Sequence, residues 1–308
     1  IARKQALLQL LSASICEQKL NNLLDSPNNI LGIEYLKALH TIQSNITPIL
    51  IPRKGAGYHE TSLDNVLPSA TGIRKLLFDT DIQQLRESYA KYSTDKSNST
   101  ILSFKTEVQP FIQKNIDTLF QIFSASIPEN ALLILTNAIV QNALLEENDL
   151  SSILGYRLLT LQKQGYSAFA DCSKDLSNKI KKNLNHYTDF HTFCELLKSK
   201  ELTHTRISRT LLHILLDIHQ TDYICTNMIP YLRVLGFKKT SSHLLSAIKR
   251  TTTVPIITKV ADASSILSSD AYTLFEKDIF ASSIYYQILA QKTHQKPLNE
   301  FTNKIIIV

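Results

Sequence analysis

The chain has 308 residues, a formal net charge of +6 and 44% hydrophobic residues. This composition excludes a largely disordered protein and provides enough apolar material for one to three domains. No apolar run approaches the roughly 18 residues of a membrane-spanning helix, so we expect no membrane partner.

The start of the sequence predicts that the chain is a fragment. It begins at Ile1, and its sole methionine is Met228. Residues 1–24 have the apolar spacing of an interior helix, and nothing that resembles a signal-peptide cleavage site follows them. We therefore expect further residues to precede Ile1 in the natural protein.

Residues 25–53 predict a helix followed by a strand. Ser26 is expected to cap the helix and Pro27 to occupy its first position, because proline lacks only an N–H that has no helical partner there. A broad buried stripe is expected from the apolar positions Ile30, Leu31, Ile33, Leu36, Ala38, Leu39 and Ile42. Residues 47–53, "TPILIPR", form a β-branched run bounded by prolines and predict a short strand, which would make half of a parallel βαβ repeat.

Three places in this region favour an anion. Asn28 and Asn29 fall in the first turn of the predicted helix, where free amides and the helix dipole attract negative charge. Simple N-terminal capping is the alternative, and the two asparagines taken alone favour it. Arg53 follows the predicted strand and precedes a loop in which Gly55 and Gly57 allow amides to approach a phosphate.

The third place is "PSATGIRK", residues 68–75. Ser69 is placed to cap a helix, and Thr71 and Arg74 are three residues apart, so that they share one helix face. A helix start, a hydroxyl and an arginine together are typical of a phosphate clamp. Such a short motif also occurs by chance. It supports a phosphate site only together with the two other anion-favouring segments nearby, at Asn28–Asn29 and at Arg53.

Beyond residue 94 the sequence becomes mainly helical. Residues 95–104 are polar and predict a linker. Apolar periodicity predicts helices at roughly 105–124, 128–146, 149–163, 174–184, 188–199, 204–219, 239–250 and 277–291, with a brief strand within 254–259. The predicted fold class is a partial parallel α/β unit of Rossmann type over 1–94, followed by a predominantly helical domain over 105–308.

The net positive charge is concentrated in one segment. The segment from Lys200 to Val260 contains nine basic and three acidic residues. Its net charge of +6 equals the net charge of the whole chain. The candidate nucleic-acid contacts in this segment are Arg206, Arg209, Arg233, Lys238, Lys239, Lys249 and Arg250. A polyanionic partner, with nucleic acid ahead of a membrane surface, is the prediction, and a solvated basic face is the alternative.

The cysteines predict a reducing compartment. Cys16, Cys172, Cys194 and Cys225 lie far apart without a C-x-x-C pair, which indicates reduced thiols and a cytoplasmic location. His191 and Cys194 in "HTFC" are one helical turn apart, as in half of a metal site. No second half with ligand spacing is visible, so we expect a packed helix face and no metal site.

No nucleophile–base pair, Walker motif or pair of carboxylates stands out. The sequence therefore favours chemistry that depends on positioning and charge stabilisation, and nucleotidyl transfer is of that kind. A non-catalytic RNA-binding protein with a degenerate nucleotide-binding domain is the alternative. A helical interaction scaffold ranks third, because it explains neither the clustered glycines nor the localised charge.

Several ordered segments resemble one bacterial enzyme family, the tRNA(Met) cytidine acetate ligases. They are "SPNNILGIEYLKAL", "IPRKGAGYHE", "PSATGIRK", "THTRISRTLLHILLDI", "IPYLRVLGFKK" and "PIITK". The likeness extends from about residue 25 to about residue 286. It implies a nucleotidyltransferase-like fold and an enzyme that uses ATP, with Mg²⁺, and acetate to form acetyl-adenylate. Such enzymes then acetylate N4 of the wobble cytidine of elongator tRNA(Met).

The resemblance also implies roles for individual residues. Asn28 or Asn29, with Asn28 preferred, and Arg53 would contact ATP, and the phosphate-binding residues would be Ser69, Thr71 and Arg74. The family's H-x-G-H nucleotide motif, which should precede all of these, does not occur in the chain. We therefore expect these 308 residues alone not to form acetyl-adenylate.

Overall fold

The computed structural model describes residues 26–52, 69–77, 131, 134–135, 138–139, 141–224 and 229–308. It divides into two compact units, Ile1–Gln141 and Asn142–Val308. The predicted helices at 1–24 and 105–124 and the predicted linker at 95–104 lie outside the described residues.

In the first unit, helix α3 (Pro27–Thr41) begins with proline at its first turn, as predicted. The predicted cap is wrong, because the Ser26 side chain makes no capping hydrogen bond. The predicted buried stripe is also wrong: α3 has no buried residue, and Ile30 and Leu36 are 38% and 43% exposed. An apolar stripe is buried only where another element covers it, and no described element covers α3 to that extent.

The predicted strand after α3 is wrong for Thr47–Pro52, which has no regular structure. Ile49, Leu50 and Ile51 are 78–88% exposed. A strand needs a hydrogen-bonded neighbour, and Pro48 and Pro52 remove two backbone donors from this short run. The parallel ladders of the described residues lie in the second unit.

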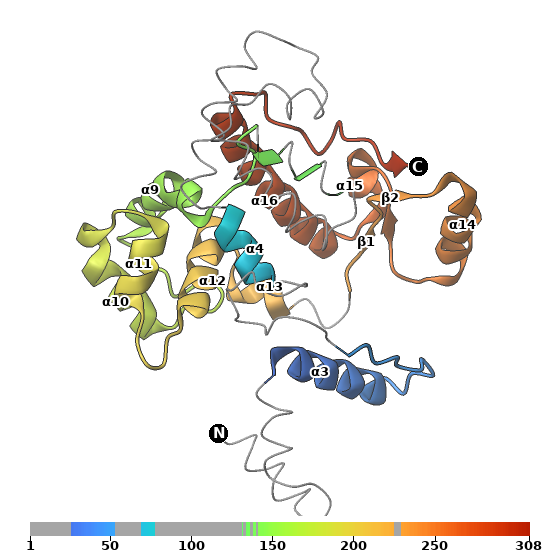
Figure 1. Ribbon diagram of the computed structural model, residues 1–308, viewed down its shortest axis with the longest axis horizontal. Helices are drawn as coiled ribbons and strands as arrows, with labels where there is room; N and C mark the ends of the chain where they lie inside the picture. The colour runs from blue at the N-terminus through green and yellow to red at the C-terminus, as the bar shows by residue number, and fades with distance from the viewer. Residues whose placement is uncertain are drawn as a thin grey trace, which may run out of the picture. The chain divides into compact units, whose positions relative to one another are not determined.

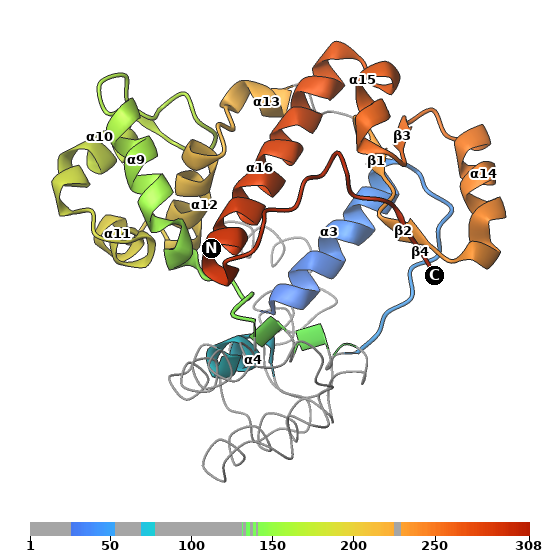
Figure 2. The ribbon, with the colours of Figure 1, turned by 90° about the horizontal axis from the view of Figure 1, so that it is seen from above.

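The second unit opens with a helical cluster, in which the helices lie together in Figures 1 and 2. Its elements are η1 (Glu147–Leu150), α9 (Ser151–Leu161), α10 (Lys174–Asn183), η2 (Leu184–His186), α11 (Phe190–Leu197), α12 (His204–Leu215) and α13 (Gln220–Ile224). The core contains Leu154 and Leu158 from α9, Phe193 from α11 and Leu211 from α12, all with no exposed surface. Side-chain caps begin three of the helices: Ser173 caps α10, Asp189 caps α11 and Thr203 caps α12.

Short strands and further helices follow. They are β1 (Leu232–Arg233), β2 (Gly236–Phe237), η3 (Lys239–Ser241), α14 (Ser242–Thr251), β3 (Ile256–Ile257), η4 (Val260–Asp262), α15 (Ala263–Ile266), α16 (Ser269–Thr293) and β4 (Ile306–Ile307). β1 pairs in parallel with β3, and β2 with β4. A Cβ at Gly236 would lie 2.8 Å from the Ile306 carbonyl oxygen, so the second pairing needs glycine there.

The long helix α16 connects these two parts of the second unit (Figure 2). At its start, Ala271 and Phe275 pack with Ile257 of β3 in a second core cluster. Farther along, Lys277 lies 3.1 Å from the Asp222 carboxylate, and Lys292 lies 2.7 Å from Asp149 in η1.

The helices predicted for the second unit are confirmed, with most ends shifted by a few residues, although α16 begins at Ser269, eight residues before the predicted start at 277. The brief strand is confirmed at Ile256–Ile257. The helix predicted for 128–146 is helical at the described residues 131, 134–135 and 138–139 but has ended by Asn142, whose φ of 55° is left-handed. Asparagine tolerates this conformation and commonly ends helices. Among the described residues, no helix is both long and apolar enough to cross a membrane.

Candidate functional site

The N-terminus of α3 leaves backbone donors available. Asn28 and Asn29 lie in its first turn with exposed side chains, and no acidic residue accompanies them. The first helical hydrogen bond runs from the Ile30 N–H to the Ser26 carbonyl, 3.0 Å away. Because the Ser26 hydroxyl provides no cap, the amides of Asn28 and Asn29 have no acceptor from it. Such a helix end is suited to an anion.

Helix α4 (Ala70–Leu77) begins differently, because Ser69 caps it. The Ser69 Oγ accepts a hydrogen bond from the Gly72 N–H at 2.9 Å, and Ser69 is only 1% exposed. The predicted cap is therefore confirmed. Thr71 is half-buried and Arg74 is exposed, one helical turn apart on α4. The guanidinium of Arg74 is thus accessible, whereas the Ser69 hydroxyl accepts a hydrogen bond from the backbone of α4.

Arg53 and the glycine loop that follows it lie outside the described residues. The convergence of Asn28, Arg53 and the Ser69–Arg74 segment on one phosphate site therefore stays a prediction.

The candidate RNA contacts on α12 differ in their surroundings. Arg206 is exposed, and no described carboxylate pairs with it. Arg209, one turn later, is bound to Asp171, with its Nε 2.7 Å from Oδ2. Asp171 adopts a left-handed φ of 59° in the loop before α10. Part of the charge of Arg209 is thus neutralised within the fold.

Arg233 is the second candidate RNA contact that is paired with a carboxylate of the fold. Its guanidinium is hydrogen-bonded to Glu300, a carboxylate only 8% exposed. Burial raises the pKa of Glu300, but hydrogen bonds from Arg233, Ser282 and Tyr286, together with the charge of Arg233, outweigh burial. The net pKa of Glu300 is therefore below its ordinary value of 4.5.

The remaining candidate cations flank or end α14. Lys238 and Lys239 precede this helix, and Lys249 and Arg250 lie in its last turn. All four are exposed, and within the described ranges none forms an ion pair with a carboxylate. With Arg206, five of the seven predicted contacts are exposed and form no ion pair with a described carboxylate, whereas Arg209 is exposed but paired with Asp171. Cations at a helix C-terminus also stabilise the helix dipole, so part of the function of Lys249 and Arg250 is local.

Tyr231, one of the aromatic residues near this segment, is not free to stack on a base. Its side chain is half-buried, and its hydroxyl donates a hydrogen bond to Asp278. Burial raises the pKa of Tyr231, and Asp278 raises it further.

Sequence reasoning missed the acceptors Asp171 and Glu300. Each lies far from its arginine in the chain, 38 residues for Asp171 and 67 for Glu300. No local spacing signals such pairs. The left-handed turn at Asp171 has no glycine to mark it.

Comparison with known proteins gives the family. The profile described as HIGH Nucleotidyl Transferase matches residues 1–300. The chain belongs to this family. The HIGH nucleotidyl transferase assignment agrees with the α/β nucleotidyltransferase-like fold expected from the sequence.

Individual relatives within this family carry one common name, tRNA(Met) cytidine acetate ligase. The chain is 29% identical to the tRNA(Met) cytidine acetate ligase of Halothermothrix orenii, over 99% of this chain and 66% of that protein. It is 30% identical to the enzyme of the same name from Caldanaerobacter subterraneus, over 99% of this chain and 64% of the relative. The chain therefore spans about two thirds of the length of the curated relatives it matches.

Solved structures show the same fold. The crystal structure of apo Thermotoga maritima TmcAL matches all of this chain and 66% of its own, with a TM-score of 0.73 and 20% identity. A second crystal form of that protein, bound with alpha-thio ATP, matches with a TM-score of 0.72. The likeness extends over both units of this HIGH nucleotidyl transferase.

Proposed function

We propose that this chain belongs to an ATP-dependent tRNA(Met) cytidine acetate ligase. The enzyme would join acetate to ATP as acetyl-adenylate, release pyrophosphate, and acetylate N4 of the wobble cytidine of elongator tRNA(Met). The observation that carries this proposal is the similarity, over nearly the whole chain, to relatives of that name.

The first unit would hold the nucleotide. Supporting observations are the α3 N-terminus, where Ser26 supplies no cap, and the exposed guanidinium of Arg74 on α4. The amides of Asn28 and Asn29 and the guanidinium of Arg74 would oppose the charge of the phosphates, together with Arg53 and with Mg²⁺. Thr71 would add a hydroxyl from the same face of α4. The crystal structure of Thermotoga maritima TmcAL bound with alpha-thio ATP supports this assignment.

The second unit would bind the tRNA backbone. The predicted contacts that are exposed and not paired with a described carboxylate are Arg206, Lys238, Lys239, Lys249 and Arg250. Contacts of this kind position a nucleic acid without reading its bases. Recognition of the anticodon would need further contacts.

The test of the nucleotide site uses acetate-dependent ATP–pyrophosphate exchange. The assay needs a protein in which the family's H-x-G-H motif precedes these residues. Arg74→Ala should reduce exchange strongly and leave tRNA binding unchanged. Lys75→Ala is the matched control, because Lys75 is the next residue on α4, is also exposed and is not one of the predicted phosphate contacts Ser69, Thr71 and Arg74.

Three other results would lead to different conclusions. Equal exchange in Arg74→Ala and Lys75→Ala would remove α4 from the nucleotide site. Equal loss of exchange and of tRNA binding in Arg74→Ala would indicate misfolding. Absence of any exchange, with tRNA binding retained, would favour the non-catalytic RNA-binding protein.

A further inference from the structure

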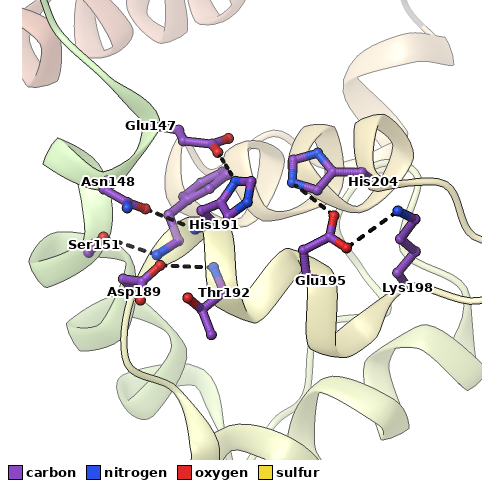
Figure 3. Close-up of polar contacts among 10 residues, drawn as sticks. Glu147, Asn148, Ser151, Asp189, His191, Thr192, Glu195, Lys198 and His204 are labelled. Carbon is purple, nitrogen blue, oxygen red and sulfur yellow. Dashed lines mark hydrogen bonds and ion pairs between the residues drawn. The ribbon is translucent and has the colours of Figure 1, made fainter. Parts of the chain in front are cut away.

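Three side chains with metal-ligand chemistry meet in the helical cluster of the second unit (Figure 3). They are Glu147 from η1, His191 from α11 and His204 from the start of α12. Each offers one ligand atom, and the three atoms lie within 4.8 Å of one another. The two imidazole rings have centroids 5.2 Å apart.

Hydrogen bonds to the first turn of α11 fix the position of His191. The His191 N–H donates to Asn148 Oδ1 at 2.9 Å, and the preceding N–H, of Phe190, donates to Ser151 Oγ at 3.0 Å. The Asp189 carboxylate accepts from the Thr192 N–H at 2.8 Å. The helix start is therefore joined to η1 and α9, and the imidazole is held beside Glu147 (Figure 3).

The Glu147 carboxylate is available for this site. The capping box of η1 uses the neighbouring carboxylates of Glu146 and Asp149. Glu147 itself contacts Nδ1 of His191. The local helix thus does not need the Glu147 side chain as a cap.

His204 supplies an unsatisfied nitrogen. Its Nε2 is buried and has no hydrogen-bond partner within the described part of the chain. The nearest carboxylate, Glu195, is 3.8 Å away, which is too far for a hydrogen bond. A buried polar atom without a hydrogen-bond partner is destabilising. A metal ion bound to this nitrogen would remove this destabilisation.

We propose that Glu147, His191 and His204 bind a divalent transition-metal ion, with Zn²⁺ as the best-fitting ion. Two imidazole nitrogens and one carboxylate oxygen form a known zinc ligand set, and they leave one position open for water. The carboxylate of Glu195 adds a second negative charge beside the ion. Mg²⁺ is disfavoured, because it prefers oxygen ligands.

The ion would tie three elements of one core together. η1, α11 and α12 surround the same buried cluster, and Glu147 lies 44 residues before His191. Metal binding would therefore stabilise the helical cluster of the second unit. This inference is independent of the proposed ligase function, because it uses none of the predicted nucleotide or RNA contacts.

Cys194 does not belong to this site. It lies one turn after His191 but is fully buried in the core. Burial raises the pKa of its thiol to about 12. The metal site is therefore separate from the His191–Cys194 pair considered in the sequence, and its other ligands come from distant parts of the chain.

The test is a calorimetric titration of Zn²⁺ into the untagged 308-residue chain. One equivalent should bind. His191→Ala and Glu147→Gln should each weaken binding by more than about tenfold, since loss of even an outer hydrogen bond to a metal ligand costs 10–100-fold. His186→Ala is the matched control, because it removes an exposed histidine of the same unit that is outside the cluster. All variants keep the four cysteines, so thiols cannot cause a difference between them.

Thermal unfolding provides a second measurement. Zn²⁺ at about 100 times the dissociation constant should raise the melting temperature by about 5–10 °C in the wild type and in His186→Ala. At the same Zn²⁺ concentration the rise should be about half as large or less in His191→Ala, and Mg²⁺ should have no effect. Circular dichroism of each metal-free variant checks that it is folded. Absence of stoichiometric Zn²⁺ binding, or equal binding in His191→Ala and His186→Ala, would overturn the proposal.

Discussion

The guanidinium of Arg233 on β1 binds the carboxylate of Glu300, which lies 67 residues later in the chain and is almost fully buried. This pair joins the strand region to the chain after α16. The pairing gives Arg233 a structural role that is independent of RNA binding.

Glu300→Gln should destabilise the protein by about 1–3 kcal/mol at pH 7, because it leaves the guanidinium of Arg233 without a charged partner. The pKa of Glu300 is lower in the folded state than its ordinary value of 4.5. Its stabilising contribution is thus complete above about pH 4.5 and is lost as the pH falls through the folded pKa. Urea unfolding at a series of pH values measures this.

The difference between wild type and Glu300→Gln should shrink below pH 4.5. Glu276→Gln serves as the control, because Glu276 is an exposed carboxylate on α16. A constant difference from pH 7 to pH 3 would contradict the assigned charge pair.

If the exposed cations contact tRNA phosphates, they should determine how strongly tRNA binding depends on salt concentration. Arg206→Ala and Lys249→Ala should each weaken tRNA binding and reduce the slope of log K against log salt by about 1. Lys37→Ala, an exposed lysine of α3 outside the basic segment, should leave the slope unchanged. Binding at several salt concentrations gives the slopes. Unchanged slopes in both variants would exclude these cations as phosphate contacts.

Two serines at helix starts form a matched pair. Ser69→Ala should destabilise α4 by about 1 kcal/mol, because it removes the hydrogen bond to the Gly72 N–H. Ser26→Ala should change α3 little, because the Ser26 side chain caps nothing. Hydrogen exchange followed by mass spectrometry reports each helix separately. Faster exchange of α3 in Ser26→Ala, equal to the effect on α4 in Ser69→Ala, would contradict the difference between the caps.

The buried thiols should be inert. Burial raises the pKa of Cys172 and of Cys194 to about 12, so almost no thiolate is present at pH 8. N-ethylmaleimide should therefore leave both unlabelled in the native protein and modify both in urea. Peptide mass spectrometry distinguishes these cysteines from Cys16 and Cys225. Rapid native labelling of Cys194 would show that the core around α11 opens.

The sequence predicted what depends on local pattern. The helices of the second unit follow from apolar periodicity, and the Ser69 cap from residue type alone. The strand at 47–53 was predicted because β-branched residues favour strands, but strand formation depends on a neighbouring chain that local sequence does not reveal. The Ser26 cap was wrong for a similar reason, because a serine at a helix start need not direct its hydroxyl to the backbone.

In the candidate sites too, local sequence does not reveal which residues folding brings together. The identity of the cations is visible in the sequence, whereas the pairing of Arg209 and Arg233 depends on carboxylates brought near by folding. Likewise, "HTFC" directed attention to Cys194, while the side chains that meet His191 are Glu147 and His204. Their separation along the chain gives no periodic signal.

The two lysines that hold α16 have a geometric consequence. Lys277 and Lys292 are 15 residues apart, which corresponds to about 22 Å along a helix, and each binds a carboxylate of the helical cluster. A rod anchored at two such points cannot swing about either one. The helical cluster and the strand region that packs on the start of α16 therefore keep a fixed separation. Under the proposed function, a bound tRNA would have to match that separation.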